Sequence, residues 1–194
     1  MLHTMAKRFF LPLNVVAVPD KDTGAIVLRG INDSPANATI ALEAQAVSMT
    51  GAVRTLGKKT LKLPTSHAVD AMRLGKDALK DDEFLFFAWR DGDGALIGEN
   101  DFFPKAYKYY DLPRAHVKAA WSEGENGPQV RLSSDHVALF VTATSDMPGH
   151  FSDNGVTLLP GRATTLTFTP RHGAKATAKT AAKGFRVRNL SETH

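Results

Sequence analysis

The sequence contains no cysteine among its 194 residues and no long apolar run. Without cysteine, neither a disulfide nor a thiolate metal site can form, so the fold depends on a packed core. No run of about 18 apolar residues occurs, and we therefore expect no membrane-spanning helix. Lys7 and Arg8 precede only a short apolar stretch with no small-residue cleavage site, which does not match a signal peptide.

Acidic residues are missing from positions 171–190, which carry six basic residues. These are Arg171, Lys175, Lys179, Lys183, Arg186 and Arg188. The rest of the chain has 18 basic against 20 acidic residues, so the formal charge of +4 comes from this one segment. Binding of nucleic acid needs a basic face rather than one local run. We therefore expect no nucleic-acid partner.

Motifs for catalysis and for cofactor binding are also missing. The acidic residues stand mostly in turns, where carboxylates are common, and no strand–helix alternation is long enough for a (β/α)8 barrel. The seven histidines form no pair at metal-ligand spacing, and no Gly-x-Ser-x-Gly motif occurs. Gly92-Asp93-Gly94 lacks the third glycine and the setting of a dinucleotide-binding loop. We predict no catalytic residue, no metal site and no cofactor.

The sequence is rich in short apolar runs separated by turn residues. In the first half the runs cover residues 24–33, 38–48, 54–63, 83–90 and 95–103. The last two flank Asp91-Gly92-Asp93-Gly94, and two apolar runs joined by Asp-Gly predict a β-hairpin. Strands at regular spacing, punctuated by glycine and proline, are typical of β-sandwiches.

A second series of runs follows Asp111-Leu112-Pro113. It covers residues 116–121, 129–133, 137–144, 156–159, 164–169 and 185–190. The sequence therefore predicts an all-β chain with two tandem β-sandwich domains, one over residues 11–112 and one over residues 113–194.

Helical segments are few. Leu2, Met5, Ala6 and Phe9 share a helical face, so residues 1–10 are predicted to be the end of a helix or linker that enters from upstream. Residues 174–182, rich in alanine and lysine, are predicted to form a short exposed helix or a mobile segment. For residues 70–80 we expect at most a single helical turn.

The strand at residues 84–89 is apolar on both sides. Phe84 and Phe86 point one way, and Leu85, Phe87 and Trp89 point the other. A strand with one solvated face alternates polar and apolar residues, so we expect the second face to be covered by a neighbouring domain or by parts of the protein outside this chain. The alternative is a wide sandwich core with a partly exposed Trp89.

Five aromatic residues are candidates for contact with a sugar or with another domain. They are Trp89, Tyr107, Tyr109, Tyr110 and Trp121. Flat aromatic rings can stack on sugar rings, but tyrosine and tryptophan are also common where protein surfaces pack together. Both alternatives stay open for these residues.

The most specific stretch runs from residue 138 to residue 161. It contains Gly149-His150-Phe151-Ser152-Asp153-Asn154, then the apolar residues 156–159 and a Pro160-Gly161 turn. This stretch resembles the last domain of β-mannosidases of glycoside hydrolase family 2, to which β-galactosidases and β-glucuronidases also belong. Residues 2–10 and 84–103 are similar to earlier segments of the same enzymes, but this similarity is weaker than that of residues 138–161.

The resemblance implies two immunoglobulin-like accessory domains from the C-terminal region of a β-mannosidase. In that family a jelly-roll domain, an immunoglobulin-like domain and a catalytic barrel precede them. The barrel holds both catalytic glutamates, and neither has a counterpart in this sequence. The chain is thus expected to be a truncated form, a split gene product or a proteolytic fragment, with the N-terminal and barrel domains as its partners.

The run at residues 149–154 also has a physical interpretation as a structural corner. Pro148-Gly149 supplies a turn, Phe151 can enter the core, and residues 152–154 can bond to nearby backbone groups. Gly155 permits a backbone angle that other residues avoid. The alternative is a loop that reaches the rim of the parent's active site.

Three functions remain open from the sequence. The leading one is a non-catalytic accessory region that supports the barrel of an enzyme cleaving terminal β-D-mannosides. The second is an autonomous module that binds manno-oligosaccharide. The third is an immunoglobulin-like domain that binds another protein, for which the doubly apolar strand near Trp89 is the main support.

Overall fold

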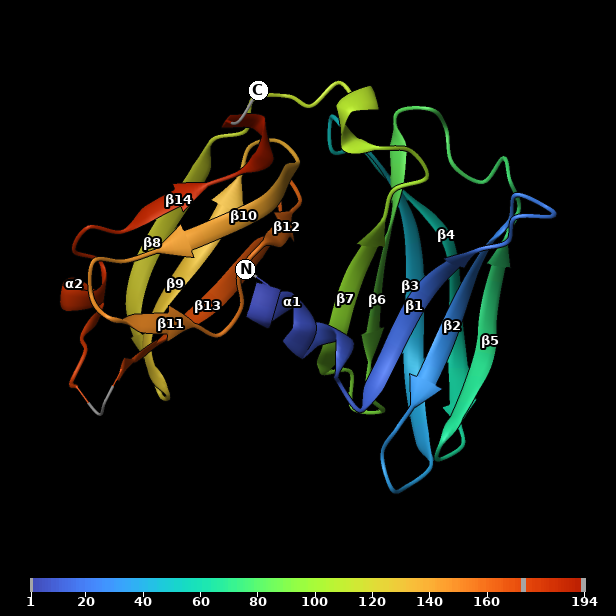
Figure 1. Ribbon diagram of the computed structural model, residues 1–194, viewed down its shortest axis with the longest axis horizontal. Coiled ribbons are helices and arrows are strands. Elements are labelled where there is room, and N and C mark those ends of the chain that lie inside the picture. The colour runs from blue at the N-terminus through green and yellow to red at the C-terminus, as the bar shows by residue number, and fades with distance from the viewer. Residues whose placement is uncertain (1, 172–173, 193–194) are drawn as a thin grey trace. The chain divides into compact units, whose positions relative to one another are not determined.

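The computed structural model describes residues 2–171 and 174–192, and the side chains from residue 6 onward (Figure 1). The chain is all-β, as predicted, and its strands pair antiparallel. It packs into two compact units, one of residues 7–111 and one formed mainly by residues 112–194. We call them the N-terminal unit and the C-terminal unit. In the described part of the chain no helix is long and apolar enough to cross a membrane.

The N-terminal unit contains seven strands in two sheets. They are β1 (Leu13–Pro19), β2 (Ile26–Asn32), β3 (Ala38–Ser48), β4 (Val53–Leu63), β5 (His67–Leu74), β6 (Glu83–Arg90) and β7 (Leu96–Phe102). One sheet has the order β1-β2-β5 and the other the order β4-β3-β6-β7. A short 3-10 helix, η1 (Tyr107–Tyr109), follows.

The core of this unit lies between residues that alternate along the strands. On β3, Ile40, Leu42 and Ala44 are buried at every second position, as the period of a strand requires. Leu85, Phe87 and Trp89 on β6 meet them from the neighbouring strand of the same sheet. Val15 and Leu28 enter the same cluster from the other sheet. The apolar alternation of the sequence therefore builds a core between the two sheets.

The predicted hairpin at Asp91–Gly94 is confirmed. Strands β6 and β7 pair from Leu85 opposite Phe102 to Arg90 opposite Leu96. The Asp91 carboxylate accepts a hydrogen bond from the Ala95 backbone N–H at 2.8 Å, and Gly94 has φ of 85°. Glycine adopts this left-handed conformation without the steric cost of a Cβ.

The described residues of the C-terminal unit also form seven strands. They are β8 (Val117–Gly124), β9 (Gly127–Ser134), β10 (Ala138–Thr144), β11 (Gly149–Phe151), β12 (Val156–Leu158), β13 (Ala163–Pro170) and β14 (Arg186–Arg188). They form sheets of order β11-β13-β9-β8 and β12-β10-β14. The buried residues Val130, Leu132, Leu166 and Phe168 contribute to its separate core.

The helices match the sequence in part. Helix α1 spans Leu2–Phe9, close to the predicted segment, although the prediction that Leu2 and Met5 share a face concerns side chains outside the described ones. Helix α2 covers only Ala178–Ala181 of the predicted residues 174–182. A 3-10 helix, η3 (Leu190–Glu192), lies near the C-terminus.

Three strands have no counterpart among the predicted runs, namely β1, β5 and β11. Residues 70–80, for which at most a single helical turn was expected, contain no helix: β5 extends to Leu74, and a turn closed by the Ala78 N–H on the Gly75 carbonyl at 3.0 Å follows. The sequence leaves open whether the basic segment 171–188 is ordered. Its described residues include α2 and β14, while His172 and Gly173 lie outside the described residues, as does His194.

Candidate functional site

A cluster of four aromatic rings follows strand β7. Phe103 stacks on Phe84 of β6 with ring centroids 4.6 Å apart and an interplanar angle of 10°. Tyr107 and Tyr110 meet the Phe103 ring edge-on, at 4.7 and 5.6 Å. Offset-stacked and edge-on pairs are the arrangements that aromatic rings prefer. We call these four residues the aromatic cluster.

The aromatic cluster corrects the interpretation of the doubly apolar strand. The expected cover for its second face was a neighbouring domain or a part of the protein outside this chain. At Phe84, which is fully buried, the cover is Phe103 of the same unit. The alternative of a partly exposed Trp89 is wrong as well, because that side chain is only 2% exposed.

Tyr110 is held at the edge of the cluster by polar contacts. Its hydroxyl donates to the Glu83 carbonyl oxygen at 3.4 Å, and Lys105 Nζ lies 4.6 Å above its ring. The same ammonium binds the Asp81 carboxylate at 2.9 Å. Burial raises the pKa of Tyr110 to about 12, so its hydroxyl stays protonated and acts as a donor.

Tyr107 and Tyr109 differ in exposure although both belong to η1. Tyr107 packs on Phe103, and burial together with the negative charge of Asp101 raises its pKa. Tyr109 is 63% exposed, and Lys108 Nζ lies 5.0 Å from the centre of its ring. Of the three tyrosines, Tyr109 is thus the one that offers an open aromatic face.

The two tryptophans are packed within the two units. Trp89 lies in the core, where its indole N–H donates to the Leu13 carbonyl oxygen at 3.1 Å. The Trp121 ring packs against Phe185 and Phe151, with centroids 5.2 and 6.1 Å away. Its indole nitrogen is buried without a hydrogen-bond partner in the described part of the chain. Stacking of a sugar on Trp89 would require this core to open, because no face of the ring is free.

The segment 149–155 turns the chain between β11 and β12. Phe151 is 7% exposed and meets Phe168 of β13 at 5.2 Å in the core. Gly149 lies against the same strand, and a Cβ at this position would be 2.6 Å from the Thr169 carbonyl oxygen. A side chain at residue 149 would therefore push β11 away from β13.

Polar side chains of this segment bond to backbone groups of other strands. The Asn154 amide donates to the Ala143 carbonyl at 2.9 Å and accepts from the Ala143 N–H at 2.8 Å. Ser152 accepts from the Thr167 N–H at 3.0 Å, and its own N–H donates to the Thr167 carbonyl at 2.7 Å. These bonds tie the turn to β10 and to β13.

Asp153 and Gly155 complete the turn locally. The Asp153 carboxylate accepts from the Asn154 N–H at 2.7 Å, and Gly155 has φ of 72°. The partners Ala143 and Thr167 were not among the predicted residues, because each lies more than ten positions away and carries no sequence signal of its own. The role of residues 149–154 as a structural corner stays a prediction, now with named hydrogen bonds.

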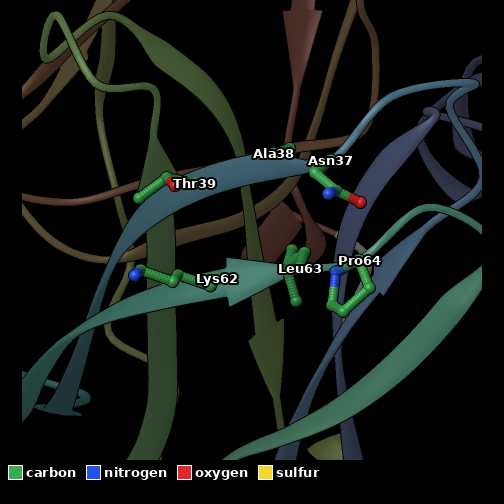
Figure 2. Close-up of a pocket in the computed structure, with 6 residues that line it drawn as sticks. All are labelled: Asn37, Ala38, Thr39, Lys62, Leu63 and Pro64. Atoms are coloured by element: carbon green, nitrogen blue, oxygen red, sulfur yellow. The ribbon is translucent and has the colours of Figure 1, made fainter.

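A shallow pocket of about 290 Å³ lies where β3 begins and β4 ends (Figure 2). Its lining residues are Asn37, Ala38, Thr39, Lys62, Leu63 and Pro64. Figure 2 shows Thr39 and Lys62 side by side at one end, while Asn37 and Pro64 lie at the other. The polar groups do not converge on one point, so the pocket lacks the geometry of a catalytic or cofactor site.

Several carboxyl groups are held in the ionised form. The hydrogen bond from Arg73 lowers the pKa of Asp20 to about 2, and the hydrogen bond from Arg29 lowers the pKa of Asp70. A glycosidase needs one carboxyl whose pKa is raised so that it can act as the acid.

Within the described residues, no group of three histidine, aspartate or glutamate side chains is placed to hold a metal ion.

Comparison with known proteins supports the sequence resemblance. The family model named Ig_mannosidase, described as an Ig-fold domain, matches residues 112–193. None of the curated protein sequences matches the chain significantly.

Solved structures match nearly the whole chain. The β-D-mannosidase of Dictyoglomus thermophilum is 21% identical over 97% of this chain, with a TM-score of 0.84. The exo-chitosanase of Amycolatopsis orientalis is 16% identical over 97%, with a TM-score of 0.64. This chain spans only 23% and 28% of those two proteins, respectively. At these identities the likeness establishes the fold.

The fold, the segment 149–155 and the comparisons agree. The chain is all-β with tandem immunoglobulin-like sandwiches, its residues 112–193 match the Ig-fold family model, and as a whole it resembles the accessory region of glycoside hydrolases such as β-mannosidase.

Proposed function

We propose that this chain is a non-catalytic accessory region of a β-mannosidase, and that it supports the catalytic barrel of that enzyme. The observation that carries the proposal is the likeness to the D. thermophilum β-D-mannosidase over 97% of the chain, together with the family match at residues 112–193. The N-terminal and barrel domains would then be its partners, and the enzyme's substrate a terminal β-D-mannoside.

The chemistry of the chain agrees with a supporting role. Glycoside hydrolysis uses two carboxyl groups about 5–9.5 Å apart across a sugar-binding cleft, one of them with a raised pKa. Here Asp20 and Asp70 pair with arginines at the surface, and Glu83 pairs with Arg54 at 2.6 Å. These carboxylates are engaged in holding strands together, so we expect no turnover of 4-nitrophenyl β-D-mannoside by the chain alone.

The test is a hybrid enzyme in which this whole chain replaces the matching part of the D. thermophilum β-D-mannosidase. We expect the hybrid to be soluble and to hydrolyse 4-nitrophenyl β-D-mannoside. The control is the same enzyme with that part deleted and nothing put in its place. A hybrid no more soluble and no more active than the control would refute the proposal, as would robust hydrolysis by the isolated chain.

Tyr109 favours one alternative function, the binding of manno-oligosaccharide by the chain itself. Its ring is 63% exposed, and Lys108 lies beside it as a hydrogen-bond donor. This alternative expects heat on titration of the chain with mannohexaose, and loss of that heat in Tyr109→Ala but not in Tyr107→Phe. If millimolar mannohexaose gives no heat, the alternative is excluded.

A further inference from the structure

Exposed large apolar side chains are concentrated in the N-terminal unit. The described residues include six of them, and all lie between residues 7 and 111: Phe9, Phe10, Val18, Val53, Leu96 and Tyr109. Phe9 and Phe10 are consecutive in the chain and are 61% and 85% exposed. Single apolar residues at a surface are ordinary, but two consecutive phenylalanines that both face water are a candidate contact site for a partner.

The backbone that carries this pair is fixed. The side-chain amide of Asn14, itself 6% exposed, donates to the carbonyl oxygens of Arg8 at 3.2 Å and of Phe9 at 3.1 Å. The Leu11 N–H donates to the Arg8 carbonyl at 3.3 Å. These bonds satisfy carbonyls at the end of α1 that have no partner within the helix. The two rings are therefore presented from a fixed turn.

The surroundings of the pair are also cross-linked by hydrogen bonds. The Asp33 N–H donates to the Pro12 carbonyl at 2.8 Å, which ties the β2–β3 loop to the start of β1. Asn32, fully buried, donates to the Leu63 carbonyl at 2.9 Å and so adds the end of β4. Several loops at one end of the unit thus form a firm base for Phe9 and Phe10.

Leu96 is a further exposed apolar residue at this end of the unit. The Trp89 indole donates to the Leu13 carbonyl, and Trp89 pairs with Gly98 two residues after Leu96. The starts of β1 and β7 therefore lie at the same end of the N-terminal unit (Figure 1). Leu96 is 45% exposed. We call Phe9, Phe10 and Leu96 the apolar end.

We propose that the apolar end is a docking surface for the catalytic part of the glycoside hydrolase, with Phe9 and Phe10 as its two anchors. The inference rests on the proposed function. About three quarters of each of the two solved relatives lies outside the part that this chain matches, and that remainder is the source of a folded apolar partner. Aromatic residues on a fixed backbone make effective anchors, because little conformational freedom is lost when they are buried.

The absence of cysteine from the sequence allows a direct test. Phe10→Cys places a single thiol on the apolar end, and Val53→Cys places one at a strand start with 50% exposure in the same unit. Both variants are alkylated with iodoacetamide, as the isolated chain and within the hybrid enzyme, and labelling of each peptide is followed by mass spectrometry. We expect alkylation of position 10 to slow at least about ten-fold in the hybrid, and that of position 53 to be unchanged.

A second pair of variants measures the contribution of the rings. Phe9→Gln with Phe10→Gln is expected to leave the thermal midpoint of the isolated chain unchanged, since both rings face water, and to lower that of the hybrid by several degrees. The matched control, Val18→Thr with Val53→Thr, removes exposed apolar groups elsewhere in the unit and is expected to change neither midpoint.

The outcomes separate the two proposals. An active hybrid in which position 10 is alkylated as fast as in the isolated chain, or position 53 is protected equally, would refute the docking surface alone. Protection of position 10 in the isolated chain at rising concentration would assign the patch to a second copy and would also refute it. If the hybrid without any substitution neither folds nor hydrolyses the substrate, the proposed function is refuted, and this inference with it.

Discussion

Asparagine side chains fix the irregular parts of both units. Asn14 bonds to the end of α1, Asn32 bonds to the β2–β3 loop and to Leu63, and Asn154 bonds to both backbone groups of Ala143. In each case the amide replaces a backbone partner that regular structure would have supplied. Single polar residues therefore determine where turns are held, while the apolar residues determine where strands lie.

Replacement of Asn154 tests this role. Asn154→Ala leaves the N–H and the C=O of Ala143 without their partner, so we expect a loss of about 1–3 kcal/mol in the free energy of unfolding. Urea unfolding followed by tryptophan fluorescence measures it. Asn126→Ala, at an exposed turn of the same unit, is the control and is expected to change stability by less than about 0.5 kcal/mol. An equal effect in both variants would contradict the role.

The sequence predicts which residues have such bonding side chains, but it does not predict their partners. Asn154 and Ser152 are recognisable as turn residues with bonding side chains, because Asn and Ser compete for nearby backbone groups. Their partners are Ala143 and Thr167, which belong to strands brought close only by the tertiary fold. The burial of Trp89 is equally invisible in the sequence, since it depends on β1 crossing beside it.

At the scale of elements, apolar content decides which strands are recognisable. Strand β6 has the predicted bounds, since its residues from Phe84 to Phe87 and Trp89 are apolar and buried. Strand β5 carries His67, Asp70 and Arg73 on exposed positions, so its apolar signal is diluted. Strand β11 has only three residues and begins at the glycine of Pro148-Gly149, a pair that predicts a turn. Short or polar strands thus depend on neighbours for their conformation.

Contact between β6 and β7 depends on the absence of a side chain at Gly98. A Cβ there would lie 2.8 Å from Cε2 of Trp89, which is anchored by its bond to Leu13. We expect Gly98→Ala to lower the free energy of unfolding by about 1–3 kcal/mol, because the indole must shift within a packed core.

The control for this effect is Gly92→Ala in the neighbouring hairpin turn. A Cβ at Gly92 would meet no atom within 4 Å, so we expect little change in stability. Urea unfolding of both variants decides the comparison, and near-ultraviolet circular dichroism reports the environment of Trp89. A neutral Gly98→Ala variant with an unaltered spectrum would show that the close packing is not required.

Glu83 links β6 to β4 in a pH-dependent manner. Burial alone would raise the pKa of its carboxyl, but hydrogen bonds from the Lys80 N–H at 2.9 Å and from Arg54 at 2.6 Å lower it. A carboxyl with a lowered pKa in the folded state stabilises the fold at neutral pH. That contribution is lost as the pH falls below the ordinary value of 4.5 and through the folded-state value.

Glu83→Gln tests this dependence. We expect it to lower stability at pH 7 by on the order of 1 kcal/mol, and to lower it less at pH 3, because the stabilisation by a carboxylate of lowered pKa declines below the ordinary value of 4.5. Urea midpoints of the two proteins at the two pH values give the comparison. A difference that stays the same or grows on acidification would contradict the expected linkage.

At the scale of the whole molecule, the two cores share no residue. The N-terminal core contains Leu28 and the C-terminal core contains Leu132, and both side chains are fully buried. We expect two unfolding transitions in calorimetry, because each core can be lost without the other. Leu28→Ala or Leu132→Ala is expected to lower one midpoint by about 10 °C or more and to leave the other in place. A single transition that both variants shift would contradict this.

The sequence predicts the architecture of the whole molecule, but it does not predict which partners the molecule binds. Repeated strands and turns predict sandwiches, because each sheet must bury one apolar face. The run at residues 149–154 added the resemblance to β-mannosidases, which the family match bears out. The partner proposed for Phe9 and Phe10 would supply a surface from outside this sequence, so no pattern within the sequence can predict that partner.

The aromatic cluster determines where a shortened form of the protein, limited to the first sandwich, can end. Strand β7 ends at Phe102, and a version cut there would keep every strand of the first sandwich. It would lose Phe103, Tyr107 and Tyr110, and the bare Phe84 ring would face water. We expect such a version to precipitate during purification, whereas one that ends at Asp111 stays in solution. The residues after the last strand are as much a part of this domain as the strands.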